Sequence, residues 1–429
     1  MVSAPTDLPT AREREIARQG ERLAVALAAR GHEVVVHTRR VDATAPDEER
    51  LAPGATLRHV TVGPARELSE DELSAALNDF GRALAAEWRS NPPDVVHAYS
   101  WTSGLAVSAA RRQLRESALI GGGASAPPVP AVLTFTGFGS QQRHRDRSAD
   151  SALANRIRLE VALARSVEMM VAGSDDEIEE LSRMGVPRNR IRLVPRGIDV
   201  ERFSPNGPSA HRPDTPRVLA LGEAAPVSGL ETMIAALRGL PGVELVILPS
   251  PADGRPGGDE LARLRSGAAA LGVADRVVFV EEEAGPEFRP TLLRSADAVV
   301  CVPWSGPVDA GPVLEAMACG VPLVVTGTGA LTDVVVDGVT GVHVAPRRPD
   351  QLATAIRALL GDPVRRLGFG VAGADRARSR YEWARLAADA ERVYATLVPV
   401  APAEDARPED ARPEDAVPTQ GADLIQATD

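Results

Sequence analysis

The sequence predicts an α/β protein in which parallel strands alternate with covering helices, and three observations support this. The stretch from Ala296 to Gly341 passes from an apolar run, 298–302, through a loop rich in Gly and Pro to a short helical segment around Glu315 and a second apolar run, 323–326. Strand and helix patterns alternate elsewhere as well. The 429 residues are enough for two or three domains with large cores.

The composition is that of a globular protein with aliphatic cores. Hydrophobic residues make up 44%, charged residues 25% and aromatic residues only 3%. Cys301 and Cys319 lie in apolar surroundings, so we expect buried free thiols rather than a disulfide or a metal site. No apolar leader and no run approaching a transmembrane helix is present, which favours a cytoplasmic protein.

The formal net charge is −11, and the last 29 residues contribute eight acids and two arginines, which leaves −5 for the rest. An acidic body disfavours nucleic acid as a partner and leaves at most a peripheral membrane contact. From Pro399 the chain is acidic and proline-rich and repeats EDARP, so residues 399–429 are predicted to be a disordered tail. An inert solubilising extension and an interaction tail are both compatible with this composition.

The first half of the chain begins with residues 1–4, which read as the remnant of a strand. Arg12 to Arg30 follows as an amphipathic helix that Gly31 ends. Ser174 is expected to cap a helix with acids in its first turn. The other predicted elements here are strands 33–38, 94–99, 131–135 and 169–172, helices 73–88 and 159–165, a turn at 101–104 leading into a helix through Arg112, and a loop at 121–130.

The second half repeats the same alternation. Its predicted strands after residue 217 are 218–221, 244–248 and 276–280, and its predicted helices are 289–295 and 346–360. Three glutamates, 281–283, follow one of the strands and are expected in a solvated loop. For the stretch around Glu315 the pattern alone leaves two interpretations. Either it is an ordinary strand–helix–strand unit, or the helix N-terminus binds an anion.

Three longer motifs resemble the family-4 glycosyltransferases: ARGHEVVV (29–36), GVPRNRIRLVPRGIDVERF (185–203) and LEAMACGVPLV (314–324). The resemblance extends over residues 12–397 and implies the GT-B fold, in which two Rossmann-like domains face each other across a cleft. It places the acceptor-side domain at 1–203, the nucleotide-sugar-side domain at 204–385, and a closing helix at 386–398 that crosses back onto the first domain.

The same resemblance implies transfer of a sugar from a nucleoside-diphosphate sugar with retention at the anomeric carbon and with no required metal or other cofactor. Glu315 would hydrogen-bond the donor ribose, and the helix N-terminus at 311–314 would face the diphosphate. The donor-nucleotide positions implied by the resemblance are Gly222, Glu223, Ser228, Gly229, Gly311, Val313, Leu314 and Glu315.

Five features depart from the family pattern, and each lies at a place that the resemblance implies is functional. Residues 5–10 replace a glycine-rich loop, and without glycine a backbone does not easily approach a phosphate. Thr136 stands where the family has a histidine. Glu223 and Ser228 stand where an arginine and a lysine hold the diphosphate. The first acid of the Glu315 motif is missing, because its place falls at 306 or 307.

The catalytic residue is therefore left open, with His97 and Asp309 as candidate cleft groups and His144 expected on the surface. A carboxylate at position 223 would repel a diphosphate. We predict a homologue with impaired or lost transfer that keeps its scaffold for a weak ligand or a protein partner. The alternative is a competent transferase with a remodelled cleft.

Overall fold

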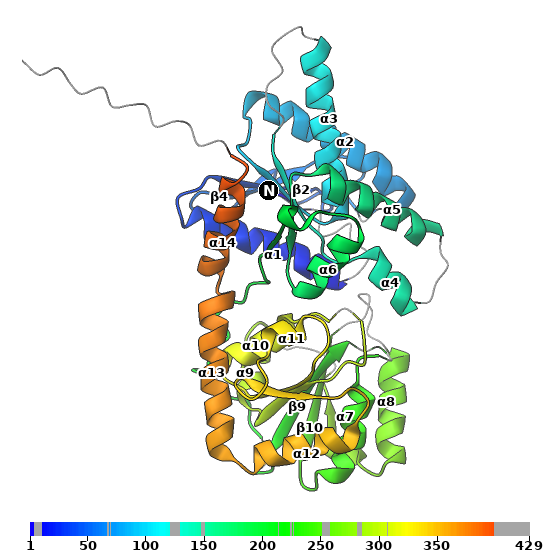
Figure 1. The fold of residues 1–429 in the computed structure, drawn as a ribbon, viewed down its shortest axis with the longest axis vertical. Helices are drawn as coiled ribbons and strands as arrows, with labels where there is room; N and C mark the ends of the chain where they lie inside the picture. Colours follow the sequence, from blue (N-terminus) through cyan, green and yellow to red (C-terminus); the bar gives the residue numbers. More distant parts are fainter. Residues whose placement is uncertain are drawn as a thin grey trace, which may run out of the picture. The chain divides into compact units, whose positions relative to one another are not determined.

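In the computed structural model the chain forms two sheets, one mainly and one wholly parallel, that are covered by helices (Figure 1). Predictions for residues 5–10, 281–283 and 399–429 lie outside the described part of the chain, as do those for Pro307 and the His144 side chain. The structure describes residues 1–3, 11–66, 68, 70–120, 129–146, 151–212, 214–223, 225, 227–250, 258–280, 285–306 and 308–398.

The first sheet has the strand order β3-β4-β2-β1-β5-β6-β7-β8 within the described residues. Neighbouring strands are parallel except β3 and β4. The two residues of β1 lie in the middle of this sheet, so the predicted strand remnant is a central strand. The strands are β1 (Val2–Ser3), β2 (Val34–Arg39), β3 (Glu48–Ala52), β4 (Ala55–Val60), β5 (Val96–Tyr99), β6 (Ala131–Thr134), β7 (Met169–Ala172) and β8 (Ile191–Leu193).

Six helices belong to this part of the described chain. The predicted turn at 101–104 is wrong, because these residues form the first turn of a helix that runs to Ile120. Ser174 caps the helix predicted after it by accepting a hydrogen bond from the backbone N–H of Glu177. The helices are α1 (Ala11–Ala28), α2 (Glu70–Ser90), α3 (Trp101–Ile120), α4 (Gly139–Asp146), α5 (Ser151–Ser166) and α6 (Asp175–Arg183).

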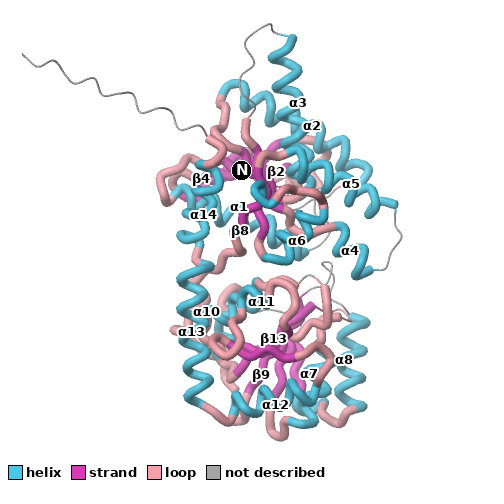
Figure 2. Tube along the Cα trace, in the orientation of Figure 1, coloured by secondary structure: helices cyan, strands magenta, loops and turns pink. Residues whose placement is uncertain are grey.

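The second sheet is parallel throughout, with the order β11-β10-β9-β12-β13-β14 (Figure 2). The direction of winding reverses between β9 and β12. Its elements are β9 (Arg217–Glu223), β10 (Glu244–Ser250), β11 (Val277–Phe279), β12 (Ala298–Cys301), β13 (Leu323–Thr326) and β14 (Gly341–Val344), with α7 (Leu230–Ala236), α8 (Gly258–Ala270), α9 (Phe288–Arg294), α10 (Gly311–Ala318), α11 (Leu331–Val334) and α12 (Pro349–Leu360).

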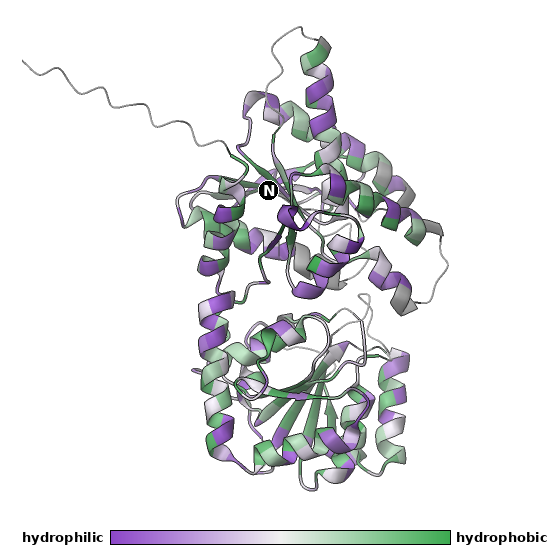
Figure 3. Ribbon diagram, in the orientation of Figure 1, coloured by the Kyte–Doolittle hydropathy of each residue, from purple (hydrophilic) through white to green (hydrophobic). Residues whose placement is uncertain are grey.

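Both faces of the second sheet are buried, which explains its continuous apolar strands (Figure 3). Leu219 and Leu221 of β9 pack into one core cluster together with α10. Val218 and Ala220, which alternate with them, pack into a second cluster with α7 and α12. The two cysteines are free and buried, as expected, and burial raises the pKa of each thiol to about 12.

Two C-terminal helices lead the chain from the second sheet back to the first. α13 (Pro363–Tyr381) ends at Glu382, which has an extended backbone, and α14 (Trp383–Ala395) follows at once. Ala387 and Ala390 of α14 share a core cluster with Leu23 and Leu27 of α1. The last described helix thus completes the core of the first domain. Within the described residues, no helix is both long and apolar enough to cross a membrane.

His97 of β5 lies beneath α14 and is 3% exposed. One ring nitrogen, Nδ1, lies 2.7 Å from the Tyr394 hydroxyl, and the other, Nε2, lies 2.8 Å from Thr134 Oγ1. Desolvation by burial, together with the positive N-terminus, lowers the pKa of His97 from 6.5 to about 3. The imidazole is therefore neutral in the folded chain across the physiological pH range.

We expect His97 to make the folded chain less stable at acidic pH. The unfolded chain binds a proton at this residue below pH 6.5 and the folded chain does not, so the stability present above that pH is lost as the pH falls. Between pH 6.5 and pH 5 the loss is about 2 kcal/mol. Urea unfolding at both pH values measures it. His97→Gln should show a smaller loss, whereas His211→Gln at an exposed site should follow the unmodified chain. Equal losses in all three proteins would contradict this role.

Candidate functional site

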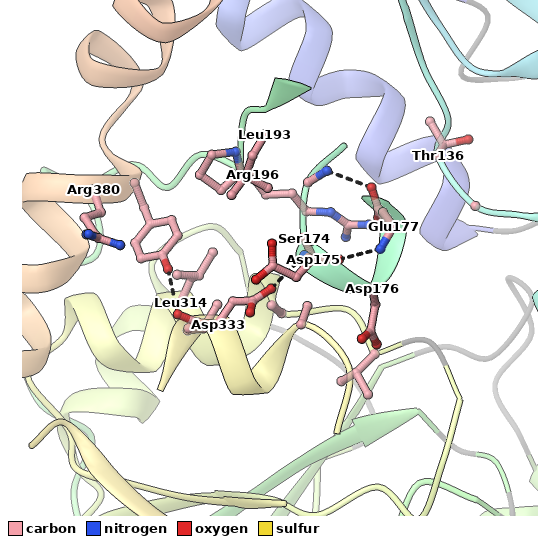
Figure 4. Close-up of a pocket in the computed structure, with 18 of the residues that line it drawn as sticks. Thr136, Ser174, Asp175, Asp176, Glu177, Leu193, Arg196, Leu314, Asp333 and Arg380 are labelled. Atoms are coloured by element: carbon pink, nitrogen blue, oxygen red, sulfur yellow. Dashed lines mark hydrogen bonds between the residues drawn. The ribbon is translucent and has the colours of Figure 1, made fainter. Parts of the chain in front are cut away.

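A pocket of about 650 Å³ is lined by residues from both halves of the described chain (Figure 4). It includes the ends of several parallel strands and the starts of α6 and α10. Its lining includes Thr136, Gln141, Gln142, Asp175, Asp176, Glu177, Arg196, Glu223, Val308, Ala310, Leu314, Asp333, Arg380, Arg385 and Asp389.

A buried ion pair positions the loop that enters the pocket from β6. Glu160 of α5 is fully buried and accepts a hydrogen bond from the backbone N–H of Gly139 at 2.9 Å. Arg156, one helical turn earlier, donates to Glu160 at 2.8 Å and to the side-chain oxygen of Gln142 at 3.1 Å. These contacts fix the backbone at 137–142 relative to α5. The short connection after β6 and the start of α4 therefore reach the pocket as a preorganised segment.

Thr136 follows β6 by two residues and lines the pocket, at the position where the family pattern has a histidine. Its side chain is 3% exposed. Its hydroxyl has no hydrogen-bond partner among the described residues. A buried hydroxyl without a partner costs about 1–3 kcal/mol of stability.

The N-terminus of α6 enters the pocket with three acids in its first turn, Asp175, Asp176 and Glu177. Glu177 accepts a hydrogen bond from the N–H of Gly173 at 2.7 Å. Asp333 from α11 accepts the backbone N–H of Asp175 at 3.0 Å. Of the N–H groups that open α6, that of Asp175 is thus bonded to a carboxylate and that of Glu177 to the Ser174 hydroxyl, which leaves this helix start less able to attract an anion.

Glu223 is the last residue of β9 and lines the pocket. It lies beside the point where the strand order reverses, which is where ligands bind in open α/β sheets. The next turn is tightly packed. Gly229 has φ +81°, and a Cβ built on it would lie 1.8 Å from the carbonyl oxygen of Val302. Ser228 is buried and does not line the pocket, and neither does Gly222.

α10 directs its first turn at the pocket through Ala310 and Leu314, while Val313 is buried in the core. The carboxylate of Asp309 accepts the backbone N–H of Gly311 at 3.0 Å. The same carboxylate is ion-paired with Arg196, which lines the pocket. The structure therefore brings Asp309 to the edge of the site, where it contacts a guanidinium and the start of the helix.

Glu315 follows the lining residue Leu314 in the chain but does not itself line the pocket, and it is ion-paired with Arg289 of α9. The structure does not bring His97 to the pocket, because α14 covers it. Motif comparison also did not single out Arg196, Asp175, Asp176 or Asp333. Two signals were available in the sequence: the acidic first turn after Ser174, and the motif at 185–203, which contains Arg196.

A metal centre has no support in the described part of the chain. No group of three or more His, Cys, Asp or Glu side chains there is arranged to hold a metal ion. The arrangement instead offers a preorganised loop, a helix N-terminus at 310–314 and several carboxylates. These are groups that bind and orient a polar organic ligand.

Two family profiles together match most of the chain: "Glycosyltransferase Family 4" at residues 16–202 and "Glycosyl transferases group 1" at residues 206–376. A D-inositol 3-phosphate glycosyltransferase of Geodermatophilus obscurus is 32% identical over 379 residues, which is 84% of this chain and 79% of that protein. A protein of the same description from Xylanimonas cellulosilytica is 32% identical over 405 residues, 89% of this chain and 91% of the relative.

Solved structures agree on the fold. Sucrose-phosphate synthase from Thermosynechococcus elongatus superposes with a TM-score of 0.73 at 25% identity, covering 92% of this chain and 98% of its own. HepE of Anabaena, crystallised with UDP and glucose, gives a TM-score of 0.66 at 17% identity with the same coverage, which supports the fold alone. Both confirm two Rossmann-like sheets in the GT-B arrangement.

Proposed function

Since this chain belongs to glycosyltransferase family 4, we propose that it binds a nucleoside-diphosphate sugar in the pocket at the end of β9 and that its transfer of the sugar is impaired or lost. The family reaction is retaining transfer from a nucleotide sugar. One observation carries the impairment: Glu223 lines this pocket at the start of the turn that leads to α7.

The location supports donor binding. The pocket lies at the carboxyl end of the central strand β9 and includes the first turn of α10, where a helix N-terminus favours negative charge. UDP is the first nucleotide to test, because HepE was crystallised with UDP and glucose.

The charges in the pocket oppose catalysis. A fixed cation beside the leaving diphosphate commonly stabilises the transition state by about 3–4 kcal/mol. A carboxylate at the same place destabilises it instead. Ser228 offers a hydroxyl in place of an ammonium group and is buried in the turn. Thr136 offers no imidazole. We therefore infer that a donor is held more weakly and activated less than in a complete site.

Restoring the cations should restore affinity. Glu223→Arg combined with Ser228→Lys should tighten UDP binding by tenfold or more, which is about 1.4 kcal/mol, in titration calorimetry of the whole chain. Glu49→Arg combined with Ser90→Lys makes the same change of charge at two exposed positions outside the pocket and should leave UDP binding unchanged. No difference between the two double variants would contradict a donor diphosphate at Glu223.

A competent transferase with a remodelled cleft is the second candidate, and Arg196 favours it. This guanidinium lines the pocket and contacts Asp309, which in turn binds the first N–H of α10. A cation beside that helix N-terminus replaces part of the missing charge. Release of UDP from UDP-glucose by the unmodified chain, faster than by Arg196→Ala, would support this candidate and contradict impairment.

A further inference from the structure

The outward side of α13 carries three exposed apolar side chains in line. Val364, Leu367 and Val371 are 81%, 70% and 54% exposed. Their spacing of three and then four residues puts them on one side of the helix. A Cβ added at Gly368, on the same side, would meet nothing within 4 Å. These four residues form an apolar stripe, the α13 stripe, that no described segment covers.

The opposite side of α13 is held against the second domain by close packing. A Cβ at Gly370 would clash with the carbonyl oxygen of Gly320, and a Cβ at Gly373 would lie 3.1 Å from the side chain of Met317 in α10. Phe369 lies in a core cluster of this domain. Figure 1 shows α13 in orange along the edge of the second sheet and its helices. The helix cannot rotate to bury the stripe without losing this packing, so the stripe stays exposed in the folded chain.

α13 is strongly basic although the chain is acidic. Its 19 residues include five arginines and one aspartate, which gives the helix a net charge of +4, whereas the whole chain has −11. The exposed Arg365 follows Val364 and stacks over a ring of the same helix. The exposed Arg378 lies on the side of the stripe, two turns beyond Val371, and the single acid, Asp375, lies between them. Apolar side chains among arginines are typical of helices that lie on anionic lipid surfaces.

These two features together favour a lipid surface over other occupants. A nucleic acid binds basic faces through its phosphates, but it gives exposed valine and leucine side chains no apolar partner. A second copy of the chain would bring two helices of net charge +4 together, and these charges would repel each other. An anionic bilayer suits both features, because apolar side chains enter the acyl boundary while guanidinium groups stay at the headgroup phosphates.

We propose that the α13 stripe docks the chain on an anionic membrane surface, with α13 in the plane of the headgroups and without crossing the bilayer. Val364, Leu367 and Val371 enter the boundary between headgroups and acyl chains, and Arg365 and Arg378 pair with lipid phosphates. The last turn of the same helix lines the pocket, so docking holds the pocket near the surface. This contact goes beyond the proposed function, since it requires neither a bound donor nor sugar transfer.

Flotation of the whole chain with lipid vesicles tests this contact. Vesicles of equal parts phosphatidylglycerol and phosphatidylcholine should bind the chain about tenfold more tightly than pure phosphatidylcholine vesicles, and binding should weaken as salt is raised. Val364→Ser combined with Leu367→Ser and Val371→Ser should weaken binding about tenfold or more, because three apolar side chains no longer leave water. Arg365→Gln combined with Arg378→Gln should reduce the preference for phosphatidylglycerol.

The matched control makes the same three changes at exposed residues on three other segments: Leu119→Ser, Val278→Ser and Val339→Ser, where the side chains are 80%, 46% and 51% exposed. This variant should bind vesicles as the unmodified chain does. Equal binding to both kinds of vesicle, no binding to either, or the same loss in the control would overturn the proposal. A dimer in sedimentation velocity that the triple change in α13 abolishes would also overturn it, in favour of a second copy. Calorimetry with UDP reports on the pocket separately.

Discussion

Glu160→Ala should lower the free energy of unfolding by about 3–5 kcal/mol, because it leaves the charge of Arg156 buried without its partner. Glu160 is 0% exposed and Arg156 is 4% exposed. The substitution also removes the acceptor of the Gly139 N–H. Chemical denaturation of the whole chain measures the loss. Residues 137–142, which include the start of α4, should shift with it, so ligand binding at the pocket should weaken as well.

Two further variants distinguish the loss of charge pairing from the loss of packing. Replacing both partners, Arg156→Met with Glu160→Leu, removes the buried charges together and should cost much less than the single change. Arg158→Ala, at an exposed position on the same helix, should alter stability by about 0.5 kcal/mol or less. If the double variant is as unstable as Glu160→Ala, the loss comes from packing and not from an uncompensated charge.

Gly229→Ala should destabilise the second domain by about 3 kcal/mol or more, since the added methyl group cannot be accommodated. The residue has φ +81°, and its Cβ would lie 1.8 Å from the Val302 carbonyl oxygen. That oxygen belongs to the backbone just after β12, so it cannot rotate away. The turn that carries Ser228 towards α7 would have to open.

Gly242→Ala is the matched control for this prediction. Gly242 has φ +73°, close to that of Gly229, but a Cβ there meets nothing within 4 Å. Its substitution should therefore cost only the left-handed backbone strain, about 1 kcal/mol. The difference between the two variants in urea unfolding isolates the steric clash. Equal destabilisation would show that the close approach to Val302 is not maintained in solution.

Buried parallel strands were the elements best predicted from sequence. The strands predicted at 169–172 and 323–326 match β7 and β13 residue for residue. Both faces of such strands are covered, so they read as short continuous apolar runs. β3 was not predicted, because its residues EERLA are largely polar and exposed at a sheet edge. The start of α3 was missed because Trp, Thr, Ser and Gly are weak helix formers and tertiary packing overrides them.

The sequence by itself determined the family, the two-sheet architecture and the presence of Glu223 and Ser228 in the turn between β9 and α7, because these follow from local patterns and motifs. Only the tertiary structure decided which charges meet. Arg196 and Asp309 are ion-paired across 113 residues, and the Asp175 N–H meets Asp333 across 158. His97 lies below Tyr394, 297 residues later, which removes it from the pocket. Such contacts form because folding brings strand ends and helix starts to one edge of each sheet, and no local pattern encodes that meeting.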